Sequence, residues 1–418
     1  MIAAGVLLLV LGAVWLALVR LVPSDDELAR KAAADLQSRL GVSVTIGSLR
    51  WTLLPVPAVV LADVATGQPQ PISVKKLTLY PSLRDLIDGR LKLERAEVET
   101  AVLPQLALRG LNKAGESASL GSTATPLVRL VFRDATWISR FGQSLVFDGE
   151  VDFDPNWRPR EAQLRRPGVE PPARLSLTRQ GQEDRWTTRI DMGGGTANGE
   201  VQLETRANDR LHLTGTLQPQ GVEVTSAMAA FDRRSIVSGK ASGQTALSAT
   251  GDTIGELAQS LHTRTSFSMG KGTLLKIDVD KAIRSFGKER AGQTAMDSIT
   301  GQLDTQNTAK GMVVSFTDIR ASSGALSASG KAKIANRQIE GEFSVDLVDG
   351  LVGVPLQVSG PLNKMEVSVP RSAIAGAAVG TAILPGVGTA IGAKVGAALG
   401  QIFSPGTSSS PAPGNKKP

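Results

Sequence analysis

The sequence predicts a mainly β protein with few short helices. An N-terminal transmembrane helix would be followed by a long antiparallel, curved and groove-like β-sheet, and a Gly/Ala-rich helical hairpin would lie at the C-terminus. Three observations indicate this fold class. Apolar and polar residues alternate over many short segments, as in strands that bury one face. Aromatic residues make up 4% of the 418 residues while 44 are Gly, which favours thin strands over one large aromatic core. Apolar, helix-like stretches lie near both ends.

The first stretch is an apolar run over residues 2–19, with no charged or amide side chain before Arg20. At about 1.5 Å per residue, such a run covers most of the ~30 Å of bilayer hydrocarbon. A cleavable signal peptide would need a basic start and an Ala-x-Ala site, and the sequence has neither. We therefore expect residues 1–22 to be a retained transmembrane anchor. Its flanking charges do not set its orientation.

The composition of the chain limits which classes of binding partner and site it can have. The net charge of +7 is spread along the chain, without the basic stripe and interleaved aromatics of a nucleic-acid surface. A phospholipid membrane is the partner that this charge suits, and we expect no nucleic acid. Cys is absent, so a disulfide framework, a thiolate nucleophile and Cys-ligated metal are excluded.

After the anchor, the pattern predicts one helix and then strands. Ser24 and Glu27 form a capping box, and Gly41 ends the helix. The strands are expected at residues 42–51, 58–64, 72–80 and 90–99. Within 72–80 the apolar phase slips at Lys75-Lys76, which predicts a bulge there.

This order of elements resembles the N-terminal domain of the AsmA family of bacterial envelope proteins, over about residues 1–110. The resemblance lies in the Leu40-Gly41 junction, Gly47 to Trp51, Pro55, Leu61 to Val64, and Ser82-Leu83 through Leu86 to Gly89. It implies a β-rich protein with a single N-terminal span in the bacterial inner membrane and the bulk of the chain in the periplasm. It further implies similarity to chorein-type bridge proteins, which carry lipids along an apolar groove.

Composition and pattern divide the chain into seven parts, and Pro155 to Pro172 is expected to be an irregular loop inside the fourth. The parts are the anchor (1–22), an AsmA-like N-terminal domain (23–111), a linker (112–125), a β-rich middle region (126–250), an AsmA-like C-terminal β region (251–370), a Gly-zipper hydrophobic segment (371–404) and a disordered tail (405–418).

The C-terminal β region opens with an expected short helix at 253–262. A strand, a Gly-containing turn near Gly270, a second strand and a helical segment follow. This order resembles the C-terminal AsmA repeat, in which a small helix precedes a Gly-turned hairpin.

The Gly-zipper segment has glycines spaced by four residues, which lets helices approach closely in lipid. A helical hairpin in or against a membrane and a small-residue helix pair packed on the β region both fit, and the two stay open. The glycines are Gly376, Gly380, Gly388, Gly392, Gly396 and Gly400.

Signals for an enzyme are missing, so we expect no catalytic, cofactor-binding or metal-binding residues. His212 and His262 lack a ligand companion at i+3 or i+4. The glycines at 193–195 are not followed by the Lys-Ser/Thr of a phosphate loop. Asp278 and Asp280 fit a charged strand face or a helix N-terminus.

A sheet with one apolar face must cover it with helices, another sheet or a ligand. Candidates for lining a lipid groove are Leu77, Leu79, Leu91 and Leu93, although a closed sandwich fits the same alternation. The leading hypothesis is an inner-membrane-anchored periplasmic protein of envelope lipid homeostasis that binds or transfers phospholipid. The alternative is a non-enzymatic assembly factor, active in outer-membrane protein biogenesis through contacts with envelope proteins.

Overall fold

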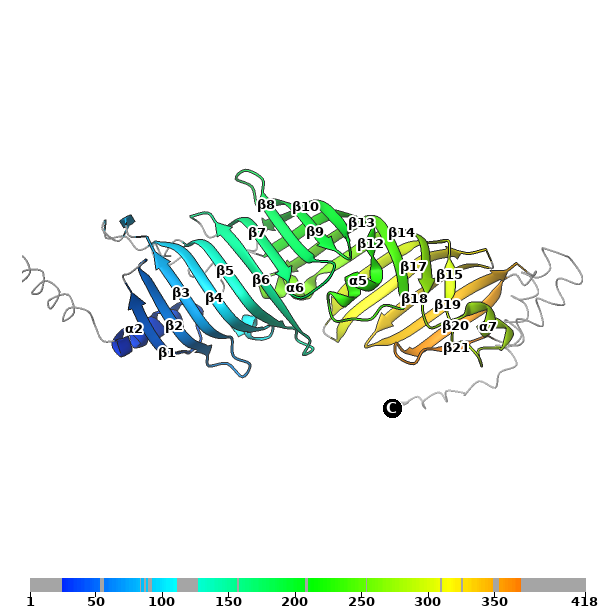
Figure 1. The fold of residues 1–418 in the computed structure, drawn as a ribbon, viewed down its shortest axis with the longest axis horizontal. Coiled ribbons are helices and arrows are strands. Elements are labelled where there is room, and N and C mark those ends of the chain that lie inside the picture. The colour runs from blue at the N-terminus through cyan, green and yellow to red at the C-terminus, as the bar shows by residue number, and fades with distance from the viewer. Residues whose placement is uncertain are drawn as a thin grey trace, which may run out of the picture. The chain divides into compact units, whose positions relative to one another are not determined.

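The chain is mainly β in the part that the computed structural model describes (Figure 1). The described residues are 25–52, 56–82, 84–85, 88, 92–110, 127–155, 158–206, 210–252, 254–308, 310–324, 326–348 and 353–369. They contain 21 strands and a few short helices. This confirms the mainly β class. The expected anchor, the 112–125 linker, the zipper segment and the tail lie outside the described residues. Within those residues, every helix is too short or too polar to cross a membrane.

The chain divides into two compact units, and each is described by itself. The first comprises the described residues of Met1–Leu217 and Leu247–Leu261, and the second those of Gln218–Ala246 and His262–Pro418.

The first unit holds one amphipathic helix and ten consecutive strands, with further short elements. Its elements are α2 (Asp25–Leu40), β1 (Val44–Thr52), β2 (Ala58–Thr66), β3 (Ser73–Pro81), β4 (Leu93–Pro104), η1 (Ala107–Gly110), β5 (Leu127–Ile138), β6 (Ser144–Phe153), β7 (Pro159–Arg166), β8 (Ala173–Arg179), β9 (Arg185–Met192), β10 (Gly195–Thr205), most of β11 (Leu211–Gln220), the end of β13 (Val237–Gly251) and α6 (Ile254–Ser260).

The expected helix and four expected strands of the N-terminal part are present as α2 and β1 to β4. Successive strands from β1 to β10 pair antiparallel, except that β4 and β5 run parallel. A parallel pair needs a crossover rather than a hairpin, and η1 follows β4 in the sequence before β5 begins.

The predicted phase slip at Lys75-Lys76 lies at an interruption of the strand pairing, and this interruption recurs at neighbouring positions of the adjacent strands. The pairing of β2 with β3 passes from Ala62–Lys76 to Val64–Val74, so Asp63 and Lys75 fall outside the ladder. Asp63 has a φ of 52°, and in the next strands Thr100 and Asp134 have φ values of 52° and 54°. The register of β1 to β5 is the same on both sides of this interruption, and along it a register shift occurs only where β5 pairs with β6, between Phe132 and Ala135.

The prediction of an irregular loop from Pro155 to Pro172 is wrong, because this stretch contains the strand β7. Pro159 is the first residue of β7, a position at which a strand tolerates proline. Within β7, Ala162 and Leu164 alternate with charged and amide side chains. The Pro159 carbonyl also accepts a hydrogen bond of 2.9 Å from the indole N–H of the buried Trp186.

The second unit is also built of antiparallel strands, and α7 packs on one face of them. Its elements are the end of β11, β12 (Val222–Glu223), α5 (Val224–Ala229), most of β13, β14 (His262–Leu274), α7 (Val279–Arg284), β15 (Thr294–Met296), β16 (Ser298–Thr308), β17 (Gly311–Ser322), β18 (Leu326–Ala335), β19 (Gln338–Leu347), β20 (Val354–Pro361) and β21 (Glu366–Ser368).

The Gly-turned hairpin expected near Gly270 is also corrected. β14 is one continuous strand through Gly270 and Gly272. Its first part pairs with β16 up to Met269, and its last part pairs with β15 from Gly272. The glycines therefore lie where the strand changes partner, not where the chain reverses.

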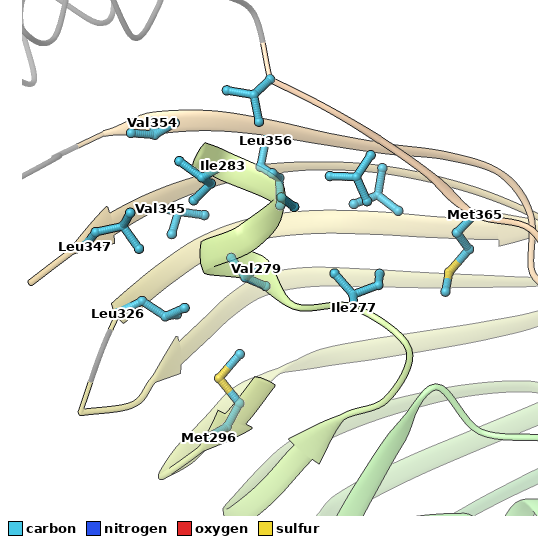
Figure 2. Close-up of a cluster of buried hydrophobic side chains, with 14 of the residues drawn as sticks. Ile277, Val279, Ile283, Met296, Leu326, Val345, Leu347, Val354, Leu356 and Met365 are labelled. Carbon is cyan, nitrogen blue, oxygen red and sulfur yellow. The ribbon is translucent and has the colours of Figure 1, made fainter. Parts of the chain in front are cut away.

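The largest core of the second unit lies under α7 (Figure 2). Asp278 caps this helix by accepting a 3.0 Å hydrogen bond from the Lys281 backbone N–H, so the helix-start reading of Asp278 is confirmed. Ala282 and Ile283 are fully buried against strand residues that include Val345 and Val354.

Candidate functional site

One face of the sheet of the first unit carries uncharged residues that line up through ten strands. Directly paired residues form two rows on it, and we call these rows together the apolar face. The first row is Leu49, Leu61, Leu77, Val98, Phe132, Gly149, Leu164, Leu175, Ile190 and Ala197, and the second is Trp51, Val59, Leu79, Ala96, Leu130, Val151, Ala162, Leu177, Thr188 and Gly199.

The opposite face is mostly polar at the equivalent positions. One of its rows reads Arg50, Val60, Thr78, Glu97, Val131, Glu150, Gln163, Ser176, Arg189 and Asn198. Ion pairs bridge neighbouring strands here. Lys76 Nζ lies 2.8 Å from Glu99 Oε1, and this contact raises the pKa of Lys76. The sheet of this unit is thus amphipathic from β1 to β10.

Much of the apolar face is left half-buried. Leu77, Leu79, Leu130, Phe132 and other large side chains of the two rows are neither covered nor fully exposed. The residues with least exposure are mostly small, or lie in the two strands next to α2, which packs against β1.

The second unit shows what the same kind of face looks like when a helix covers it. Its paired row Met269, Ile299, Ala321, Ala328, Val345 and Val354 is also uncharged. Under α7, the exposed fractions fall to 1% for Val345, 0% for Val354 and 4% for Leu356. The large side chains in the two rows of the first unit, such as Leu77 and Phe132, are more exposed than these residues under α7.

Phenylalanine rings on these faces lie across from glycines. Phe132 pairs with Gly149, Phe267 with Gly301, and Phe343 with Gly330. A Cβ built on Gly301 would lie 3.1 Å from Cζ of Phe267, and one on Gly330 would lie 2.6 Å from Cδ1 of Phe343. The ring in each pair occupies the place of the missing side chain, an arrangement that stabilises a glycine in a sheet.

The structure separates the four leucines predicted for a groove. Leu77 and Leu79 lie in the two rows of the apolar face. Leu93 begins β4 and pairs with Pro81 and Leu127, beyond a register shift between Tyr80 and Pro81. Leu91 and the six zipper glycines lie outside the described residues.

Most of the apolar face was not singled out from the sequence. Alternation marks each member as facing one side of its strand, but which side it shares with Leu77 depends on strand register. The missed members with large side chains include Val98, Leu130, Phe132, Val151, Leu164, Leu175, Leu177 and Ile190.

The two histidines have ordinary polar partners. His212 Nδ1 lies 3.1 Å from Thr250 Oγ1, and His262 Nε2 lies 2.8 Å from Asp304 Oδ2. Among the described residues, no three His, Asp or Glu side chains gather as metal ligands would. The site that the fold does build is a pair of uncharged rows, which are chemically suited to contact with an apolar molecule.

The chain matches no protein-family model, no curated protein and no solved structure. The AsmA resemblance accordingly stays a prediction from the sequence.

Proposed function

We propose that this chain is an inner-membrane-anchored periplasmic AsmA-like protein that binds phospholipid, or transfers it, along the apolar face in envelope lipid homeostasis. One observation carries the proposal: two uncharged rows of paired residues cross ten strands, and most of their large side chains from β3 to β9 are half-buried. Extended apolar surfaces of this kind mark binding sites in soluble regions of proteins.

The energetics favour an acyl chain as the cover. Burial of each CH₂ group is worth about 0.8 kcal/mol, so a chain lying along the rows gains several kcal/mol. The ion pairs of the polar face lie on the other side of the sheet, so an acyl chain on the apolar face does not remove them from water. A second sheet or a helix could also cover such a face, as α7 does in the second unit.

The length of the rows fits movement along the face. Ten strands at ~4.8 Å spacing span roughly 45 Å, whereas one leaflet of hydrocarbon is about half of ~30 Å thick. The rows are longer than a single extended acyl chain. A lipid could therefore take successive positions along the face without meeting a charged side chain.

The proposed location rests on the sequence. The apolar run at residues 2–19 supports an anchor, and the AsmA resemblance supports an inner-membrane span with the rest of the chain in the periplasm. This tether would hold the apolar face close to a lipid source.

Site-specific photo-crosslinking tests the proposal. A photoreactive amino acid at Leu77 or Phe132 should yield phospholipid adducts in the detergent-purified full chain. Matched probes at Lys76 and Arg133, on the polar face of the same strands, should not. Lipid extraction should recover co-purified phospholipid. Equal adducts on both faces, or no phospholipid, would contradict the proposal, and stoichiometric protein partners in its place would favour the assembly-factor alternative.

A further inference from the structure

The polar face of the first unit has another row of paired residues, which we call the charged row. It crosses β3, β4, β5 and β6 close to one end of each strand. Tyr80 pairs with Arg95, Arg95 with Arg129, and Arg129 with Asp152. Tyr80 is followed by the last residue of β3, and Asp152 by the last residue of β6. The row therefore lies next to the ends of these strands.

An open cavity of about 360 Å³ lies over this row. Apolar side chains form part of its wall and charged groups form the rest. It is lined by Val56, Tyr80, Glu94, Arg95, Val128, Arg129, Asp152 and Arg160.

The lining side chains carry three positive and two negative charges. Arg129 forms two hydrogen bonds with Asp152, of 2.6 Å from Nε and 2.8 Å from Nη2. Arg129 and, more weakly, Arg160 lower the pKa of Asp152 against the opposing effect of burial. Arg160 is therefore a further cationic group close to the Arg129–Asp152 ion pair.

Arg95 is held in place by its neighbours. Its guanidinium carbon lies 4.4 Å from the centre of the Tyr80 ring, and its Nη2 lies 3.3 Å from Glu97 Oε1. The Tyr80 hydroxyl in turn donates a 3.1 Å hydrogen bond to Glu97 Oε2. Arg95 and Arg129 lie side by side on paired strands, and Arg160 joins them in the lining. Because positive charges outnumber negative ones among the lining side chains, a further anion is favoured there.

We propose that this cavity binds the phosphate group of a phospholipid, with Arg95 and Arg160 as its ligands. Guanidinium groups suit phosphate because they offer paired N–H donors to two oxygens. Val56, Val128 and the Tyr80 ring provide apolar walls for the glycerol end of the lipid. The inference rests on the proposed function and names the headgroup site for it.

The position next to the strand ends allows one lipid to use both faces. Each member of the charged row has a chain neighbour in the second row of the apolar face: Tyr80 follows Leu79, Arg95 precedes Ala96, Arg129 precedes Leu130, and Asp152 follows Val151. A headgroup in the cavity can therefore extend its acyl chains around the strand ends onto the apolar face.

The test compares two lipids with identical acyl chains, phosphatidylglycerol and diacylglycerol, on the detergent-purified full chain. Native mass spectrometry measures how much of each is retained. The wild-type chain should retain phosphatidylglycerol about tenfold better, as expected for charge-assisted hydrogen bonds to phosphate. The double variant Arg95→Gln/Arg160→Gln should lose this preference and keep its diacylglycerol binding. Arg189→Gln, on the same polar face but paired with Asp191, is the control and should behave as wild type.

The outcomes separate this inference from the proposed function. Equal retention of the two lipids by wild type, or an unchanged preference in the double variant, overturns the headgroup site alone. Retention of neither lipid overturns the proposed function as well. Inorganic phosphate titrated by calorimetry provides the last arm: if it binds to wild type and not to the double variant while the lipids show no preference, the cavity is a free-phosphate site. Thermal unfolding of each variant shows that it is folded.

Discussion

Phe132 on β5 lies directly opposite Gly149 on β6, and its ring fills the space that a side chain on Gly149 would need. A Cβ built on Gly149 would lie 2.5 Å from Cζ of Phe132 and 2.5 Å from the Gln163 carbonyl oxygen on β7. Both distances are well below van der Waals contact. The pair lies in the first row of the apolar face, so the ring forms part of the surface on which we place the acyl chain.

Gly149→Ala should therefore destabilise the fold, because the new methyl group has a backbone oxygen on one side and an aromatic ring on the other. We expect a loss of about 1–3 kcal/mol in the free energy of unfolding, the usual cost of overpacking. Chemical denaturation in detergent measures it. Gly270→Ala is the matched control, since a Cβ there meets no atom within 4 Å. A loss no greater at Gly149 than at Gly270 would contradict the close packing.

Adjacent residues on opposite faces offer a direct test of lipid binding. Leu130 lies on the apolar face between Ala96 and Val151, and Val131 lies on the polar face between Glu97 and Glu150. An acyl chain over Leu130→Gln would leave a buried amide without a partner, which costs about 1–3 kcal/mol. Co-purified phospholipid should fall about tenfold in Leu130→Gln and stay unchanged in Val131→Gln. Equal losses in both variants would mean that binding does not depend on the face.

The sequence predicted most individual strands of this fold, because alternation is a local property. It could not predict which alternating residues share a face across strands. Leu77 is a candidate from the sequence alone. Leu164 and Ile190 lie in the same row, but four strand pairings separate Leu164 from Leu77 and six separate Ile190 from it. Register depends on contacts between distant residues, and a single sequence does not display them.

Proline and glycine gave the two wrong local predictions, for one physical reason. The sequence pattern predicts a loop at Pro159, yet this residue starts β7 at a position where no ladder hydrogen bond from its nitrogen is needed. The pattern likewise predicts a turn near Gly270, yet Gly270 lies where β14 changes its pairing partner from β16 to β15. Both residue types mark an irregularity in a sheet, but only the neighbouring strands decide whether the chain turns there.

Ile283 of α7 should be a major contributor to the stability of the second unit. It is fully buried among strand residues such as Val345 and Val354 (Figure 2). Ile283→Ala leaves a cavity at a site that packed strands cannot easily close, and we expect a cost of about 2–5 kcal/mol. Met312→Ala is the control, because Met312 is 43% exposed and its truncation should cost less than about 0.5 kcal/mol. Similar melting temperatures for the two variants would show that α7 does not seal this core.

Glu223 should make the second unit sensitive to acid. Burial would raise the pKa of its carboxyl, but the backbone N–H groups of Ser226, Gly239 and Thr225 donate to it at 2.6, 3.2 and 3.1 Å. The net effect lowers its pKa from 4.5 to about 2. A carboxyl whose pKa is lower in the folded state stabilises the fold fully above the unfolded-state pKa, and this contribution is lost as the pH falls through the folded-state pKa. The stabilisation should therefore decline between about pH 4.5 and pH 2.

Glu223→Gln isolates this contribution, because glutamine is uncharged at every pH. The variant should be less stable than wild type at pH 7, by about 1 kcal/mol for a weakened helix cap, and the difference should shrink as the pH falls from 4.5 to 2. Urea denaturation at a series of pH values measures both curves. Glu340→Gln, at an exposed position of β19, should instead run parallel to wild type. A constant gap between wild type and Glu223→Gln across this range would mean that the three N–H groups hold the protonated carboxyl as well as the charged one, and the pH dependence would have to come from other carboxylates.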